Sequence, residues 1–182
     1  TVVDEAGFTP AKLAELMEVK NHLYGRVSDY AKRVGATFHE GIRPWQVPMD
    51  VALPCATQNE LDASDAQTLI NNDVTCVAEG ANMPSTLEAV KLFEERRVLY
   101  APGKASNAGG VATSGLEMSQ NAMRLAWDRD EVDNRLHSIM RSIHDACLRH
   151  GQRADGSISY VDGANVAGFV KVADAMLAQG VI

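Results

Sequence analysis

The chain has 182 residues, of which 46% are hydrophobic and 23% charged, and its formal net charge is −7. This composition is typical of a globular protein, and the length suffices for one domain but not for two ordinary ones. The acidic balance argues against a nucleic-acid-binding protein, which needs a basic face. The sequence has no run of 18 apolar residues, so it predicts no membrane span. We therefore expect neither nucleic acid nor a membrane among the partners.

The first elements along the chain are two short helices. Thr9-Pro10 predicts a helix start, because a hydroxyl N-cap is followed by proline at the first helical position. A second helix is expected around residues 27–34, with Gly35 as its stop, and a short strand at 36–40. Since the sequence starts abruptly at Thr1 and not at Met, we expect it to be a piece of a longer protein.

A regular alternation follows. Short apolar runs at 49–54, 74–80 and 98–103 predict buried strands, and residues 62–72 and 84–97 between them predict helices. Strand, helix, strand, helix, strand with short links is typical of βαβ units on a parallel sheet. The sequence therefore predicts an α/β fold.

Only helices are expected after Gly110. One covers about 111–127, a second about 130–151, and the last carries an apolar stripe that includes Phe169, Met176 and Leu177. Such a stripe is typical of a helix that packs against a core, and the alternative is that it bridges back to a part of the protein that this sequence lacks.

The three cysteines, Cys55, Cys76 and Cys147, are widely spaced and form no CxxC pair. An odd number at these spacings indicates free thiols in a reducing compartment, so we expect a cytoplasmic protein without a metal site. Cys55 is expected to be a small buried residue, and the alternative is a reactive thiol beside a ligand-binding loop.

Small uncharged polar residues follow each predicted strand, in "CATQNEL" (55–61), "EGANMPST" (79–86) and "GKASNAGGVATS" (103–114). Ligands of open parallel sheets bind at the carboxyl ends of the strands. The carboxamide and ribose hydroxyls of a nicotinamide cofactor need such uncharged partners, which Thr57, Gln58 and Asn82 offer. The alternative is that these segments are ordinary turns, where the same residue types dominate. The chain has no GxGxxG pyrophosphate motif, which would then lie upstream of Thr1.

Four motifs at and beyond these loops carry a specific resemblance: "LPCATQNELD", "AEGANMPST", "APGKASNAGGVATSGLEMSQN" and "GANVAGFVKVADAMLAQGV". Together they resemble the C-terminal part of hexameric, bacterial-type, NADP-dependent glutamate dehydrogenases, over essentially the whole chain. The resemblance implies reversible oxidative deamination of L-glutamate to 2-oxoglutarate and ammonia with NADP(H), in a homo-hexamer. It also implies the C-terminal half of a Rossmann-like dinucleotide-binding domain over 1–110. A helical segment over 111–182 would pack on that half and reach the active-site cleft.

The resemblance also implies roles for single residues of the strand-end loops. Asn82 is expected beside the nicotinamide, and Ala56, Thr57 and Gln58 along its ribose. Asn107 is expected among the cofactor-binding residues, and together with Gly110 it matches the family loop that brings Val111 and Ser114 into the cleft.

Substrate contacts are implied for Ser114, which would hydrogen-bond the glutamate side-chain carboxylate, and for Val111, which would line the same pocket. The catalytic residues are expected in the N-terminal part that this sequence lacks, so the 182 residues alone are expected to be inactive. Lys104 is given no catalytic role.

Two basic residues, Lys20 and Arg26, flank "NHLYG". By position they resemble residues that favour NADP by binding its 2′-phosphate. The alternative is two solvated charges at a helix end.

Two other functions remain open. A sister amino-acid dehydrogenase acting on leucine, phenylalanine or valine would need no partner for a side-chain carboxylate, so Ser114 favours glutamate. The other alternative is a cofactor-binding fragment without catalysis.

Overall fold

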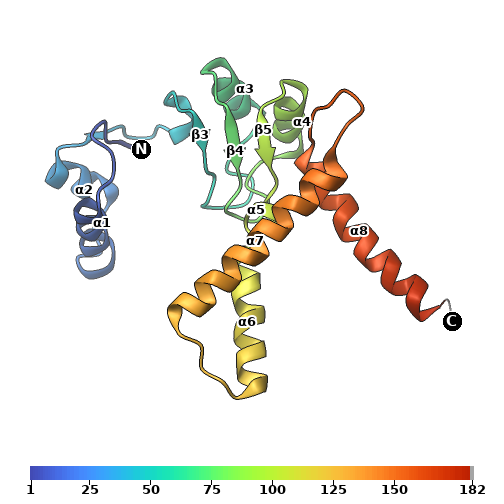
Figure 1. Ribbon diagram of the computed structural model, residues 1–182. Helices are drawn as coiled ribbons and strands as arrows, with labels where there is room; N and C mark the ends of the chain where they lie inside the picture. Colours follow the sequence, from blue (N-terminus) through green and yellow to red (C-terminus); the bar gives the residue numbers. More distant parts are fainter. Residues whose placement is uncertain (181–182) are drawn as a thin grey trace. The chain divides into compact units, whose positions relative to one another are not determined.

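The computed structural model describes residues 1–180 (Figure 1). The chain forms two compact units, Thr1–Val47 and a second that begins at Pro48. Within the described residues, no helix combines the length and the apolar character needed to cross a membrane.

The first unit is built on two helices, α1 (Pro10–Met17) and α2 (Val27–Val34), with a π-helical turn at Glu18–His22 after α1. The Thr9 side chain accepts a hydrogen bond from the Lys12 N–H and so caps α1, as predicted. Gly35 ends α2 with a φ of 71°, a left-handed conformation that favours glycine.

A small sheet and a buried aromatic cluster complete this unit. Strand β2 (Thr37–Phe38) was expected, but its antiparallel partner β1 (Val2–Val3) was not. Tyr30 is buried and stacks on Phe8 with ring centroids 5.8 Å apart. A 3₁₀ turn at Pro44–Gln46 buries Trp45.

The second unit contains the predicted parallel sheet, in the order β3 (Val51–Ala52), β4 (Cys76–Ala78) and β5 (Leu99–Ala101). Ala52, Val77 and Tyr100 are in register and buried. Phe93, on the helix that precedes β5, stacks on Tyr100 with ring centroids 5.7 Å apart. This contact packs that helix against the sheet.

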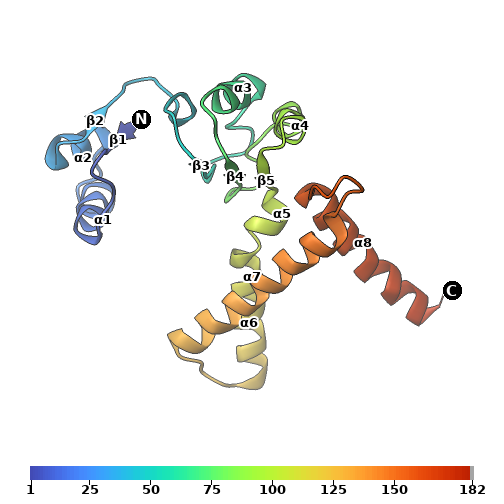
Figure 2. The same ribbon diagram turned by 45° about the horizontal axis from the view of Figure 1, so that its top comes forward.

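The crossover helices are α3 (Ala63–Asn71) and α4 (Leu87–Glu95), which contact each other beside the sheet (Figure 2). The α/β prediction is confirmed. The predicted start of α4 at Pro84 is wrong, because Thr86 caps the helix by accepting a hydrogen bond from the Ala89 N–H. Pro84 instead lies in the loop before it.

The remainder is helical, in the order α5 (Gly103–Ser106), α6 (Gly109–Met123), α7 (Arg129–Gly151) and α8 (Tyr160–Gln179). Only α5 was not expected as a helix. Helices α7 and α8 cross closely at Gly163, where an added Cβ would overlap the Cys147 carbonyl group. The division of the chain at residue 110 stays a prediction.

Two expectations about burial are wrong. The apolar stripe of α8 does not pack into a core of this chain, because Phe169 is 71% exposed and Leu177 79%. Cys55 is exposed as well, since it stands in the loop after β3 and not in the strand itself.

Candidate functional site

The loops that follow β3 and β4 lie side by side at the carboxyl edge of the sheet. The Pro54 carbonyl accepts hydrogen bonds from the N–H groups of Gly80, at 2.9 Å, and Ala81, at 3.1 Å. Further along, the Asn59 N–H donates to the Met83 carbonyl at 3.0 Å. The backbone therefore fixes the spacing of these two loops.

The segment after β5 joins the same edge. The Asn107 side-chain amide donates from Nδ2 to the Ala81 carbonyl at 2.9 Å and to Asn82 Oδ1 at 2.7 Å. The Ser106 hydroxyl donates to the Glu79 carbonyl at 2.5 Å. All three strand-end segments thus converge, as the parallel order of the strands predicts.

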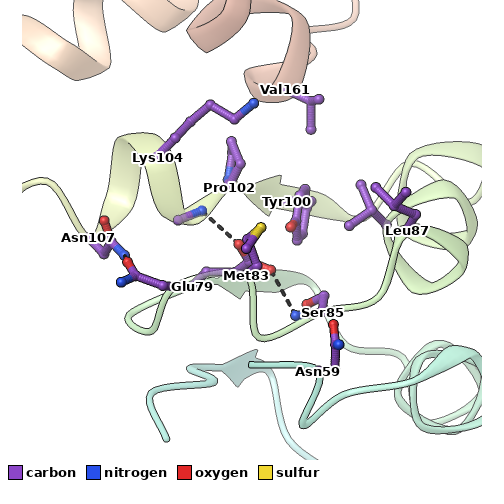
Figure 3. Close-up of a pocket in the computed structure, with 13 residues that line it drawn as sticks. Asn59, Glu79, Met83, Ser85, Leu87, Tyr100, Pro102, Lys104, Asn107 and Val161 are labelled. Carbon is purple, nitrogen blue, oxygen red and sulfur yellow. Dashed lines mark hydrogen bonds between the residues drawn. The ribbon is translucent and has the colours of Figure 1, made fainter. Parts of the chain in front are cut away.

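A cavity of about 590 Å³ opens beside these segments (Figure 3). Its polar wall includes the side-chain amides of Asn59, Asn82 and Asn107, and its apolar wall includes Leu87, Tyr100 and Val161. An apolar cavity with a few fixed polar groups is the usual form of a small-molecule site.

The Asn82–Asn107 pair retains hydrogen-bonding capacity for a ligand. In the described residues, these two side chains bond only to each other and to the Ala81 carbonyl. The Nδ2 donors of Asn82 and the Oδ1 acceptor of Asn107 are therefore available, and a carboxamide needs one of each. The residues present fit the nicotinamide half of a dinucleotide.

Glu79, in the cavity wall, is a functional candidate that the sequence interpretation missed. It is 4% exposed, and its carboxylate accepts hydrogen bonds from the Ser85 N–H at 3.2 Å and the Gly103 N–H at 2.7 Å (Figure 3). The sequence did hold a signal, an acidic residue directly after the apolar strand β4.

The Tyr100 phenol neighbours this carboxylate. Burial raises the pKa of Tyr100 far above its ordinary value, and a hydrogen bond to Glu79 together with the negative charge of Glu79 raises it further. The phenol therefore keeps its proton at all ordinary pH values and serves as a donor.

The other predicted cofactor residues of the second unit lie on the loop after β3. Ala56, Thr57 and Gln58 are exposed, and none of them lines the cavity. The Ala56 N–H donates to a carboxylate oxygen of Glu60 at 2.8 Å, which holds this loop in a turn. On either side of these residues the loop is hydrogen-bonded to the loop of Asn82, through Pro54 and Asn59.

The predicted substrate residues, Val111 and Ser114, lie in the first turns of α6. Both are exposed and outside the cavity wall, and the Ser114 hydroxyl donates only a long hydrogen bond, at 3.4 Å, to the Gly110 carbonyl. This hydroxyl is accessible to a ligand.

Lys20 and Arg26 belong to the first unit, where both are exposed. Lys20 lies in the π-helical turn after α1, and Arg26 immediately precedes α2. Lys104 in the second unit donates to Asn165 Oδ1 at 2.6 Å. Within residues 1–180 no cluster of His, Cys, Asp or Glu has the composition of a metal site.

Comparison with known proteins gives a consistent picture. The sequence profile of the Glutamate/Leucine/Phenylalanine/Valine dehydrogenase family matches residues 1–180. The chain is 64% identical over 182 residues to the NADP-specific glutamate dehydrogenase of Escherichia coli, and covers 40% of that protein. It is 60% identical over 181 residues to the Haemophilus influenzae enzyme of the same name, and again covers 40% of it.

A solved structure agrees in fold. Glutamate dehydrogenase 2 of Plasmodium falciparum superimposes with a TM-score of 0.92 at 43% identity, over 98% of this chain and 40% of that one. The chain thus spans about 40% of the length of these relatives. The motifs, the parallel sheet and the profile match agree, and the chain belongs to the Glutamate/Leucine/Phenylalanine/Valine dehydrogenase family.

Proposed function

We propose that the chain is the C-terminal part of an NADP-dependent glutamate dehydrogenase, an oxidoreductase that converts L-glutamate to 2-oxoglutarate and ammonia and also runs in reverse. The observation that carries the proposal is the convergence of three strand-end segments on one cavity, with the Asn82–Asn107 pair at its edge. The names of relatives at 60–65% identity support it.

The cavity edge would hold the nicotinamide half of the cofactor. Asn82 and Asn107 would bind and orient its carboxamide, and the exposed Ala56, Thr57 and Gln58 would run along the ribose. When bound, the nicotinamide accepts or donates a hydride, a step that depends on alignment with the substrate. The chain contributes that alignment, because backbone hydrogen bonds fix its loops.

Substrate specificity would come from the start of α6. The Ser114 hydroxyl would donate to the side-chain carboxylate of glutamate, and Val111 would pack on its methylene groups. A hydrogen bond to a charged acceptor contributes about 1.5–3 kcal/mol. The catalytic residues would lie outside these 182 residues, so the chain by itself would have no measurable turnover.

Cofactor choice is a separate part of the proposal. Relatives at 59–65% identity are named NADP-specific, whereas one from Bacteroides fragilis, 54% identical, is named NAD-specific. Specificity therefore varies among homologues with this fold, and the basic residues Lys20 and Arg26 are our candidates for contacts with the 2′-phosphate.

The remaining expectations are also proposals. Residues 1–110 would complete a Rossmann-like domain whose first half lies elsewhere in the protein, and residues 111–182 would reach the cleft between domains. The full-length enzyme would be a cytoplasmic homo-hexamer, which light scattering after size-exclusion chromatography measures directly.

The test is a steady-state assay of the full-length protein. We expect L-glutamate to be oxidised with NADP at a kcat/KM at least a hundredfold above that for L-leucine, with lower activity on NAD. A Ser114→Ala variant should raise the KM for glutamate. A preference for leucine in the wild-type protein would contradict the proposal. Glutamate-dependent NADPH formation by the 182-residue chain alone would contradict the placement of the catalytic residues outside this chain.

A further inference from the structure

Glu79 is a buried carboxylate to which the proposed function assigns no role. It directly follows β4, at the carboxyl edge of the sheet, and only 4% of it is exposed. A carboxylate removed from water is costly unless hydrogen bonds replace its hydration. Here the N–H groups of Ser85 and Gly103 and the neighbouring Tyr100 phenol replace it.

These contacts connect Glu79 to two segments that are distant in sequence. Its backbone N–H donates to the Ala101 carbonyl at 3.1 Å, and its own carbonyl accepts from the Ser106 hydroxyl. Its carboxylate bonds to Ser85 on one side and to Gly103 on the other. The residue therefore joins the loop after β4 to the start of α5.

The two amides at the cavity edge depend on this connection. Asn82 lies in the loop between Glu79 and Ser85, whose two ends the carboxylate holds together. The Asn107 N–H donates to the Gly103 carbonyl at 2.8 Å, and the Gly103 N–H donates to Glu79. Asn107 is thus linked to the Glu79 carboxylate through two successive hydrogen bonds, and Asn82 lies in the short loop that this carboxylate closes.

On the side of Gly103, away from the cavity that Glu79 also lines, the packing leaves little room for displacement. A Cβ added to Gly103 would lie 2.8 Å from the Ala81 carbonyl oxygen and 3.2 Å from Glu79 Oε2. Only a glycine lets the α5 backbone approach this closely. A shift of Gly103 that follows a change in the hydrogen bonds of Glu79 would therefore act on the Ala81 backbone, which lies directly against it.

We infer that Glu79 is a positioning residue, whose carboxylate sets the Asn82–Asn107 pair in the geometry that binds the nicotinamide end of the cofactor. The inference rests on the proposed function. Both carboxylate oxygens act as acceptors, because the hydrogen-bond partners of Glu79 described above are all donors. A glutamine would turn its NH₂ group toward one of these donors, and the pair would shift.

The experiment compares Glu79→Gln with Glu94→Gln in the full-length enzyme. Glu94, on α4, is a matched control because its carboxylate also accepts two hydrogen bonds, from Ser159 at 2.9 Å and Arg153 at 3.0 Å. It does not line the cavity of Asn82. NADPH affinity is measured by fluorescence titration, KM values for NADP and glutamate by initial rates, and stability by thermal unfolding.

We expect Glu79→Gln to raise the Kd for NADPH and the KM for NADP about tenfold, with the KM for glutamate changed less than threefold. Glu94→Gln should leave the cofactor constants within twofold even where it lowers the melting temperature equally. Tyr100→Phe keeps the carboxylate but removes one of its donors, and it should raise the Kd for NADPH two- to threefold. This variant replaces Glu79→Gln as the test if Glu79→Gln does not fold.

Cofactor constants that stay within twofold in Glu79→Gln, or that rise equally in both glutamine variants, would overturn the inference. So would an unchanged Kd in Tyr100→Phe when Glu79→Gln does not fold. A failure of the proposed function can be told apart from a failure of this inference. In the first case the wild-type enzyme would not oxidise glutamate, and the NADPH titration would still test the role of Glu79.

Discussion

Asn107 donates a hydrogen bond from its side-chain amide to the side-chain oxygen of Asn82 over 2.7 Å, across 25 positions of sequence. The same nitrogen also donates to the Ala81 carbonyl, at 2.9 Å, so the amide orientation of Asn107 is fixed by two acceptors. The pair joins the segments after β4 and β5 at the point where the proposed nicotinamide site begins.

Replacement of Asn107 by alanine tests the pair. Asn107→Ala removes both hydrogen bonds and leaves Asn82 without its partner. Because each is worth about 0.5–1.5 kcal/mol, we expect the KM for NADP of the full-length enzyme to rise roughly five- to twentyfold. Gln67→Ala is the control, since it removes a side-chain amide that donates to Asn71 Oδ1 outside the cavity, and it should change this KM less than twofold. Equal effects of the two variants would speak against a special role for Asn107.

The close crossing of α7 and α8 predicts a contrast between two glycines of one helix. Gly163→Ala would push a methyl group into the Cys147 carbonyl, whereas a Cβ at Gly168 meets nothing within 4 Å. We expect the first change to destabilise the protein by about 1–3 kcal/mol, as overpacking does. The second should be neutral or stabilise by up to about 1 kcal/mol, because alanine is the better helix former. Urea unfolding of the two variants measures the difference, and equal midpoints would refute the crossing.

Charge reversal near the first helices tests cofactor choice. In the full-length enzyme, Lys20→Glu combined with Arg26→Glu should raise the KM for NADP at least tenfold and that for NAD less than threefold. The reason is that only NADP carries a 2′-phosphate, which two added carboxylates would repel. Initial rates with both cofactors provide the comparison. A parallel increase in the two constants would mean that these residues do not recognise the phosphate.

Asp155 offers a pH-dependent prediction. Hydrogen bonds from the side chain and the backbone N–H of Ser157 hold the pKa of Asp155 below its ordinary value, and Arg97 contributes to the same shift. Such a lowered pKa stabilises the folded state above the unfolded pKa, and this contribution is lost as the pH falls through the folded pKa. Ser157→Ala should therefore raise the pKa of Asp155, as followed by NMR titration of its carboxyl carbon. A pKa that does not move would exclude the hydroxyl as the main cause.

Local patterns predicted the frame of this fold well. Thr9-Pro10, Gly35 and the alternating apolar runs identified α1, the end of α2 and the three parallel strands, because caps and burial act over a few residues. The pairing of β1 with β2 escaped prediction, since a two-residue strand has no measurable periodicity and its partners, Phe38 for Val2 and Thr37 for Val3, are distant in sequence.

The candidate site could be located from the sequence but not assembled from it. The strand ends indicated Asn82, and the family resemblance indicated Asn107. The bond between them and the bridging of two segments by Glu79 depend on how loops fold in space. For α8 the sequence predicted an apolar stripe correctly but not what the stripe contacts. Residues such as Phe169 and Leu177 have the pattern of a core helix, and a pattern does not say which surface it meets.

A crystal structure of the full-length enzyme with NADP and glutamate tests the central claim most directly. The account predicts that the side chains of Asn82 and Asn107 lie within hydrogen-bond distance of the nicotinamide carboxamide, with the Ser114 hydroxyl on the side-chain carboxylate of glutamate. A nicotinamide bound away from the ends of β3, β4 and β5, without contact to either asparagine, would contradict it.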